Sequence, residues 1–240
     1  MKSTNAAILS IAVVAILAVS AIGIGFAYQA TFTDTTSTES TATGQYLKVA
    51  DGTDPSGNIV DSLPTTATTY YLNAGIDIDN STNPAKYYWD LVSAKLTTDD
   101  KGKTAVKISQ ITTMAEKQET AKVYALFYVG AYAITSPQSI SDATVSVAAT
   151  IGQASGNVPT TKIVLAEDAY TTAPELTTLT EVTELRSQSL SSTTAADYFV
   201  YILAEWTVAQ PTSTTGSVVA NALVLPTVSV KVTATAEDFE

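Results

Sequence analysis

Acidic side chains in turns are the groups of this sequence best suited to hold a ligand. Asp51 and Asp54 stand in the turn-rich stretch DGTDPSGN, and Asp77 and Asp79 precede Asn80 at the end of an alternating stretch. Oxygen-rich turns bind Ca²⁺, which makes these four carboxylates the calcium candidates of the chain. Neither pair has EF-hand spacing, because the first has Pro at loop position five and the second lacks Gly at position six. The alternative is that they are solvated carboxylates that form turns.

Two residue types that carry most enzyme chemistry are missing, since the chain contains neither Cys nor His. Their absence excludes disulfides, thiolate nucleophiles, Ser-His-Asp hydrolysis and the usual zinc sites. The sequence also contains no S-x-x-K motif and no Gly-rich phosphate loop. The 23 acidic residues single out no catalytic carboxylate pair. We therefore predict a protein that is not an enzyme and that needs no cofactor apart from a possible calcium ion.

The balance of charge excludes further classes of function. The net charge is −11, and Arg186 is the single arginine. A surface this acidic repels phosphate backbones and anionic lipid head groups, so we expect no nucleic-acid partner. Hydrophobic residues make up 45% of the chain and charged residues 15%, which is enough apolar material for a buried core.

The N-terminus has the pattern of a secretory signal. Lys2 lies in a short polar start, the uncharged run Ala6–Phe26 follows, and small residues flank a cleavage site after Ala27. We expect residues 1–27 to be removed and the chain to be secreted, extracellular or at the cell surface. The alternative is a retained membrane anchor, because the apolar run is long enough to span a bilayer.

One motif and one group of side chains suggest contacts with sugars. Asn80-Ser81-Thr82 is a sequon in a predicted surface turn, which makes Asn80 a possible glycosylation site. The aromatic residues could form a sugar-binding strip, but such side chains more often fill a core or a subunit interface. They are Tyr87, Tyr88, Trp89, Tyr124, Phe127, Tyr128 and Tyr132.

Alternation of apolar and polar residues predicts an all-β fold. We expect a jelly-roll-like β-sandwich in one domain, residues 44–240, with one short helix at Pro174–Gln188. The helix is expected from Leu176, Leu179, Val182 and Leu185, which recur at helical spacing after a Thr172–Glu175 capping box. The expected strands are 45–50, 69–79, 87–96, 104–111, 121–134 with an interruption at Gly130, 143–151, 161–166, 198–208, 217–225 and 227–235.

The junction GFAYQATFTDTTSTESTATGQYLKV, residues 25–49, resembles that of the TasA/camelysin family of secreted fibre-forming proteins, which includes archaeal bundling-pilus subunits. An A-[YF]-F-[TN]-D-like stretch corresponds to Ala27–Asp34, a Ser/Thr-rich spacer to Thr35–Thr43, and a G-x-L-x-[LV] strand to Gly44–Val49. Gly75–Trp89 and Val228–Ala236 fit family strands more loosely. The resemblance implies a jelly-roll subunit whose N-terminal segment adds a strand to its neighbour. It also brings a metalloprotease activity described for some relatives, which the lack of His argues against.

The residues after Ala27 suit such a donor strand. Tyr28, Ala30 and Phe32 alternate with polar residues, so the segment can complete an open sheet edge. We therefore expect residues 28–43 to form a donor strand and a Ser/Thr-rich linker or polar strand. The expected function is a structural subunit of an extracellular fibre, pilus or biofilm-matrix filament, whose partner is itself, with related minor subunits as further partners. The alternatives are that Tyr28–Asp34 pairs within its own subunit, or that the chain is a membrane-anchored adhesion module.

Overall fold

The computed structural model describes residues 28–35, 37–43, 47–55, 59–99, 112–114, 120–136, 143–187, 190, 195–211 and 219–236. Nearly all of its regular structure is β-strand, and the one helical element, η1, is a 3-10 turn at Leu176–Thr178. The strands are β1 (Tyr28–Thr35), β2 (Ser37–Thr43), β3 (Lys48–Asp51), β4 (Asp61–Ser62), β5 (Thr68–Asp79), β6 (Lys86–Thr97), β7 (Thr112–Met114), β8 (Thr120–Thr135), β9 (Ala143–Ile151), β10 (Thr160–Ala166), β11 (Glu184–Ser187), β12 (Ala196–Ala209), β13 (Val219–Leu225) and β14 (Val228–Ala236).

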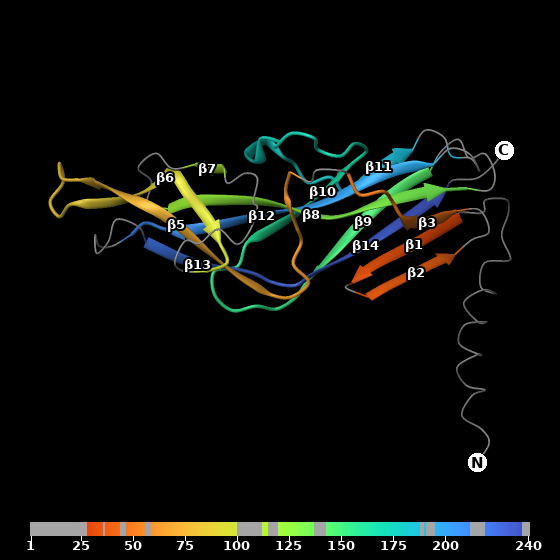
Figure 1. The fold of residues 1–240 in the computed structure, drawn as a ribbon, viewed down its shortest axis with the longest axis horizontal. Helices are drawn as coiled ribbons and strands as arrows, with labels where there is room; N and C mark the ends of the chain where they lie inside the picture. The colour runs from red at the N-terminus through yellow and green to blue at the C-terminus, as the bar shows by residue number, and fades with distance from the viewer. Residues whose placement is uncertain are drawn as a thin grey trace, which may run out of the picture.

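The strands form three sheets. The central sheet has the order β10-β12-β8-β3, and β4 and β7 also pair with β8. A five-stranded sheet, the β14 sheet, has the order β11-β9-β14-β1-β2, and a three-stranded sheet, the β5 sheet, has the order β13-β5-β6. Figure 1 shows the β5 sheet near one end of an elongated molecule and the β14 sheet near the other, with β8 and β12 running between them.

A β-bulge in β8 keeps the long central strands in register with both ends of the molecule. Tyr201 of β12 pairs with Tyr128, but the next residue, Val200, pairs with Gly130, so Val129 is the extra residue. Because side chains alternate between faces along a strand, an extra residue changes which positions face the core. The core positions of β8 are odd-numbered up to Phe127 and even-numbered from Tyr132 onward.

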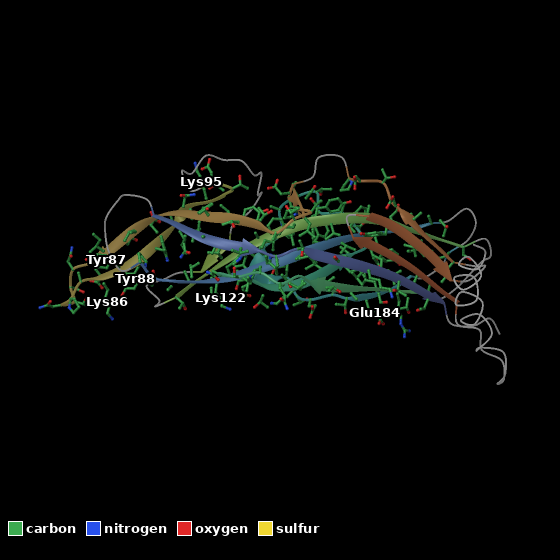
Figure 2. All side chains as sticks on the ribbon, turned by 90° about the horizontal axis from the view of Figure 1, so that it is seen from below. Lys86, Tyr87, Tyr88, Lys95, Lys122 and Glu184 are labelled. Atoms are coloured by element: carbon green, nitrogen blue, oxygen red, sulfur yellow. The ribbon has the colours of Figure 1, made fainter. Side chains whose placement is uncertain are left out.

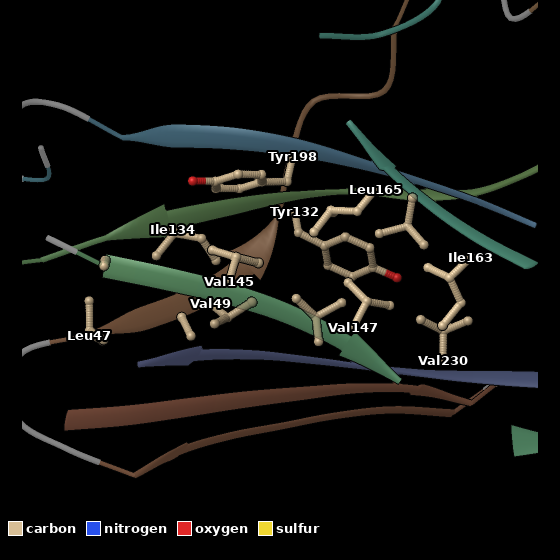
Figure 3. Close-up of a cluster of buried hydrophobic side chains, with 14 of the residues drawn as sticks. Leu47, Val49, Tyr132, Ile134, Val145, Val147, Ile163, Leu165, Tyr198 and Val230 are labelled. Atoms are coloured by element: carbon tan, nitrogen blue, oxygen red, sulfur yellow. The ribbon is translucent and has the colours of Figure 1, made fainter. Parts of the chain in front are cut away.

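One face of the central sheet therefore carries two neighbouring cores. The first lies against the β14 sheet, and Figure 3 shows Tyr132 and Tyr198 there with valines of β9 and β14. The second lies against the β5 sheet and contains Trp206 and Phe127. This arrangement is a two-layer all-β sandwich whose second layer is made of two sheets, and it confirms the predicted fold class.

The opposite face of the central sheet is covered by irregular segments. Its buried cluster contains Tyr124, Tyr128 and Tyr201, and Leu176 of η1 packs onto it. Partly buried side chains from the segments before β4 and around η1, among them Ile59, Tyr170 and Leu179, complete the cover. Loops here do the work of a third layer, which lets the sandwich bury aromatic side chains on both faces of β8.

The helix predicted at Pro174–Gln188 is wrong. The structure has only η1, then an extended segment with a bridge from Val182 to Val164, then β11. Val182 exchanges backbone hydrogen bonds with β10, to Ile163 O (2.9 Å) and from Leu165 N (3.0 Å), and Thr183 O accepts one from Val147 N of β9 (2.8 Å). A Thr-rich segment with poor helix propensity thus satisfies its backbone by linking the edges of two sheets.

Most predicted strands are confirmed within a few residues, including the interruption of β8 next to Gly130. The predicted strand 104–111 and the apolar run Ala6–Phe26 lie outside the described residues. Within the residues that the structure describes, no helix has the length and apolar character needed to cross a membrane.

Candidate assembly site

The predicted donor segment is the first arm of an N-terminal hairpin. β1 and β2 pair antiparallel over seven residue pairs, from Gln29 opposite Thr43 to Thr35 opposite Ser37. β1 also pairs antiparallel with β14 over seven residues, from Tyr28 opposite Ala236 to Asp34 opposite Val230. In a single chain the segment thus pairs within its own subunit, and the Ser/Thr-rich stretch forms the polar strand β2.

The acceptor edge for this hairpin is an apolar strand. Val230, Val232 and Ala234 of β14 are buried in the core against the central sheet. Their partners across the ladder are Asp34, Phe32 and Ala30. Antiparallel partners share a face of their sheet, so the register places position 32 beside Val232 on the face toward the core. The pairing of β14 with β9 over nine residues holds this edge in place from the other side.

Two features make the hairpin separable from the rest of the sandwich. Among the described strands, its ladder with β14 is the one strand pairing that joins it to the other sheet strands, and β2 ends the sheet. Only residues 44–46 join Thr43 of β2 to Leu47, which is buried in the core beside β3. The hairpin is therefore a small unit, connected by a three-residue joint and attached to the body by backbone hydrogen bonds.

The other predicted positions do not gather at this site. Ala27, the predicted cleavage position, lies outside the described residues, as do the side chains of Tyr28, Ala30 and Phe32. Asn80 is exposed in the turn between β5 and β6, at a distance from the hairpin along the long axis of the molecule. The glycosylation of Asn80 stays a prediction.

The structure separates the four calcium candidates into two pairs. Asp51 pairs with Tyr132 near the end of β8, and the carboxylate of Asp54 accepts a hydrogen bond from Tyr128 Oη (2.7 Å). Asp77 and Asp79 lie in the distal part of β5, where Asp79 Oδ1 accepts hydrogen bonds from Ser81 N and Ser81 Oγ. No group of three or more acidic side chains with metal-site geometry occurs among the described residues. Calcium binding therefore stays a prediction.

The aromatic side chains belong to the interior, as the packing interpretation expects. Trp89 and Phe127 lie in one core, Tyr132 in a second, and Tyr124 and Tyr128 in the cluster on the opposite face. The described positions therefore form no continuous sugar-binding strip. Only Tyr87 and Tyr88, in the hairpin β5–β6, are half-buried.

Buried phenols are the most perturbed titratable groups described. Burial and the negative charge of Asp61 raise the pKa of Tyr70 to about 12. Burial, with the hydrogen bond to Asp54, also raises the pKa of Tyr128 above its ordinary value. Burial raises the pKa of Tyr201 as well, and Tyr201 Oη accepts a hydrogen bond from Tyr170 N (3.2 Å). These groups stay neutral near pH 7 and act as packing and hydrogen-bonding side chains, not as acids or bases.

Comparison with known proteins yields no relative: no family model, no curated protein and no solved structure matches this chain.

Proposed function

We propose that the chain is a structural subunit of an extracellular filament, which polymerises when the N-terminal hairpin β1–β2 leaves its own β14 and pairs with β14 of the next copy. The observation that supports this proposal is the attachment of the hairpin by a single seven-residue ladder to an apolar strand edge. The resemblance of residues 25–49 to secreted fibre proteins supports it independently.

Exchange of the hairpin is inexpensive because it recreates the same contacts between chains. The ladder is made of backbone groups, and a second copy offers the identical register from Tyr28–Ala236 to Asp34–Val230. A short joint such as residues 44–46 favours exchange between copies over return to the same chain. Because the contact is head-to-tail and does not close on itself, repeated exchange gives a filament.

Removal of residues 1–27 is part of the proposal, since it frees the N-terminal arm at Tyr28. N-terminal sequencing of the secreted protein tests this step. A chain that still begins near Met1 would favour the membrane-anchored adhesion module instead.

A disulfide reporter tests the exchange itself, and the absence of native Cys makes it clean. Ala30 and Ala234 are directly opposed, and antiparallel partners have Cα atoms about 4.5–5.5 Å apart, within the range of a disulfide. We expect Ala30→Cys/Ala234→Cys filaments to give a covalent ladder of multimers on a denaturing gel after oxidation. The matched control, Thr161→Cys/Ala204→Cys in the β10–β12 ladder, should give intrachain bonds only.

Electron microscopy of chains that begin at Tyr28 supplies the second readout. Monodisperse particles at every concentration would contradict the filament. Filaments that contain only intrachain 30–234 bonds would show assembly through another surface.

A further inference from the structure

The far end of the molecule carries a two-stranded ribbon that extends beyond its sheet. β13 pairs with β5 only as far as Ala74, whereas β5 and β6 continue to pair from Gly75–Asp90 to Asp79–Lys86. We call residues 75–79 and 86–90 the distal ribbon. In Figure 2, Lys86, Tyr87 and Tyr88 of this ribbon lie at the end of the molecule opposite the N-terminal hairpin. A two-stranded ribbon without a third strand is only marginally stable in water, so a covering partner would stabilise it.

One face of the distal ribbon is apolar and continues the core. Ile76 is opposite Trp89 and Ile78 is opposite Tyr87, so the four side chains share a face. Trp89 is buried at the root, where its Nε1 donates to Ala209 O (2.8 Å) and its backbone N–H donates to Gln210 Oε1 (2.8 Å). Beyond it, Ile78 is 48% exposed, more than Ile151 or Val158, the other large apolar side chains that the structure shows exposed.

Charge indicates what covers this face. Residues 64–125 and 203–227, the lysine half, form the β5 sheet and the adjoining part of the central sheet, and they contain 7 lysines and 8 acidic residues by sequence. The rest of residues 28–240, the acidic half, contains 4 basic and 15 acidic residues. The net charges are −1 and −11, and no charged residue stands at 123–141 or 198–204, so the place of the division does not affect them.

The exposed lysines of the lysine half are placed to meet a partner. Lys86 lies on the distal ribbon and Lys95 further along β6, and both are exposed. Lys122 is already paired with Glu205. Glu184, on the acidic half, is exposed, as are Glu167, Asp168, Glu175 and Glu181 before it. Two acidic halves repel each other, whereas a lysine half and an acidic half do not, so charge selects the orientation of neighbours.

We propose that the apolar face of the distal ribbon docks onto the acidic half of a second copy of this chain, so that neighbouring subunits meet lysine half to acidic half. This proposal rests on the proposed filament and adds a second contact to it, separate from the exchanged hairpin. The ribbon supplies the apolar contact, and Lys86 and Lys95 exclude the reversed orientation.

Two matched pairs of variants test the contact, with the critical concentration for filament formation measured by sedimentation and folding checked by circular dichroism. Ile78→Ser should raise the critical concentration about tenfold, whereas Ile151→Ser, at a similarly exposed isoleucine (41%), should leave it within about twofold. Lys86→Glu/Lys95→Glu should raise it about tenfold or more. Lys162→Glu/Arg186→Glu makes the same change in net charge on the acidic half and should have little effect.

Cross-linking gives the orientation directly. A benzophenone placed on Asn80→Cys, at the end of the distal ribbon, should form interchain bonds to peptides of the acidic half. Bonds mainly to the lysine half of the neighbour, or equal effects within either matched pair, would overturn the docking and leave hairpin exchange standing. Absence of filaments from the unmodified chain would overturn both proposals.

Discussion

Deletion of one residue from β8 should cost little at the bulge and much inside the regular ladder. Removing Val129 brings Tyr128 and Gly130 together, and both already have adjacent partners, Tyr201 and Val200. The ladder becomes regular and no side chain changes face. Removing Ala125 instead forces part of the strand to slide by one residue, which moves its side chains to the other face. The side chains that move are Leu126, Phe127 and Tyr128, or, if the other part slides, Ala121, Val123 and Tyr124.

The two costs follow from burial. Leu126, Phe127 and Tyr128 are 1%, 0% and 4% exposed. Taking each large side chain out of its core costs about 1.5–3 kcal/mol, so the three together cost about 5–9 kcal/mol. This is comparable to the whole stability of a typical domain, about 5–15 kcal/mol. Deletion of Val129 loses one half-buried side chain and the local twist of the bulge, for which we expect about 2 kcal/mol or less.

Urea unfolding followed by tryptophan fluorescence measures both variants, since Trp89 and Trp206 are buried. The variant without Val129 should keep a cooperative transition with a slightly lower midpoint. The variant without Ala125 should be unfolded or molten at low urea. Equal losses of stability in the two variants, or a larger loss without Val129, would refute the assignment of Val129 as the extra residue.

Three further predictions concern buried side chains. Because the folded state raises the pKa of Tyr70 to about 12, the unfolded chain ionises first, and stability should be full below pH 10 and fall between about pH 10 and 12; urea midpoints that stay constant to pH 12 would contradict this. Tyr128→Phe and Asp54→Ala should show a coupling energy of about 0.5–1.5 kcal/mol in a double-mutant cycle, and additive effects would exclude a stabilising hydrogen bond. Trp206→Ala, at a fully buried position, should lower the free energy of unfolding by about 3–5 kcal/mol, and a loss below 1 kcal/mol in urea unfolding would mean that the β5 sheet does not need this side chain.

The sequence predicts the strands well where one face is buried and the other is not. β5, β9 and β14 alternate cleanly and appear within about a residue of their expected bounds. The bulge in β8 is signalled by Gly130 within an apolar run. The pairing of strands is not predictable in this way, because the contacts of β14 with β9, and of β13 with β5, join residues far apart in the chain. Nothing in local alternation therefore indicates that the second layer divides into two sheets.

The failed helix shows the limit of periodicity. Leu176, Val182 and Leu185 recur every three or so residues, but they reach different clusters: Leu176 packs on the loop-covered face, whereas Val182 and Leu185 pack on the core of the β14 sheet. An extended segment that passes from one sheet to another repeats its apolar residues at helical spacing without being a helix. For the assembly site, alternation identifies Tyr28, Ala30 and Phe32 as strand residues, but only the structure identifies β14 as their partner.

The register of β1 with β14 has a mechanical consequence for a filament joined by hairpin exchange. The donor's body pulls on its hairpin through Thr43, which lies opposite Gln29 and so near Ala236 of the acceptor strand. The acceptor's body holds β14 through Val228, at the opposite end of the same ladder. Tension along the filament therefore loads the seven residue pairs together in shear and does not peel them apart one by one. Such a joint resists stretching far better than the same hydrogen bonds would if they were unzipped from one end.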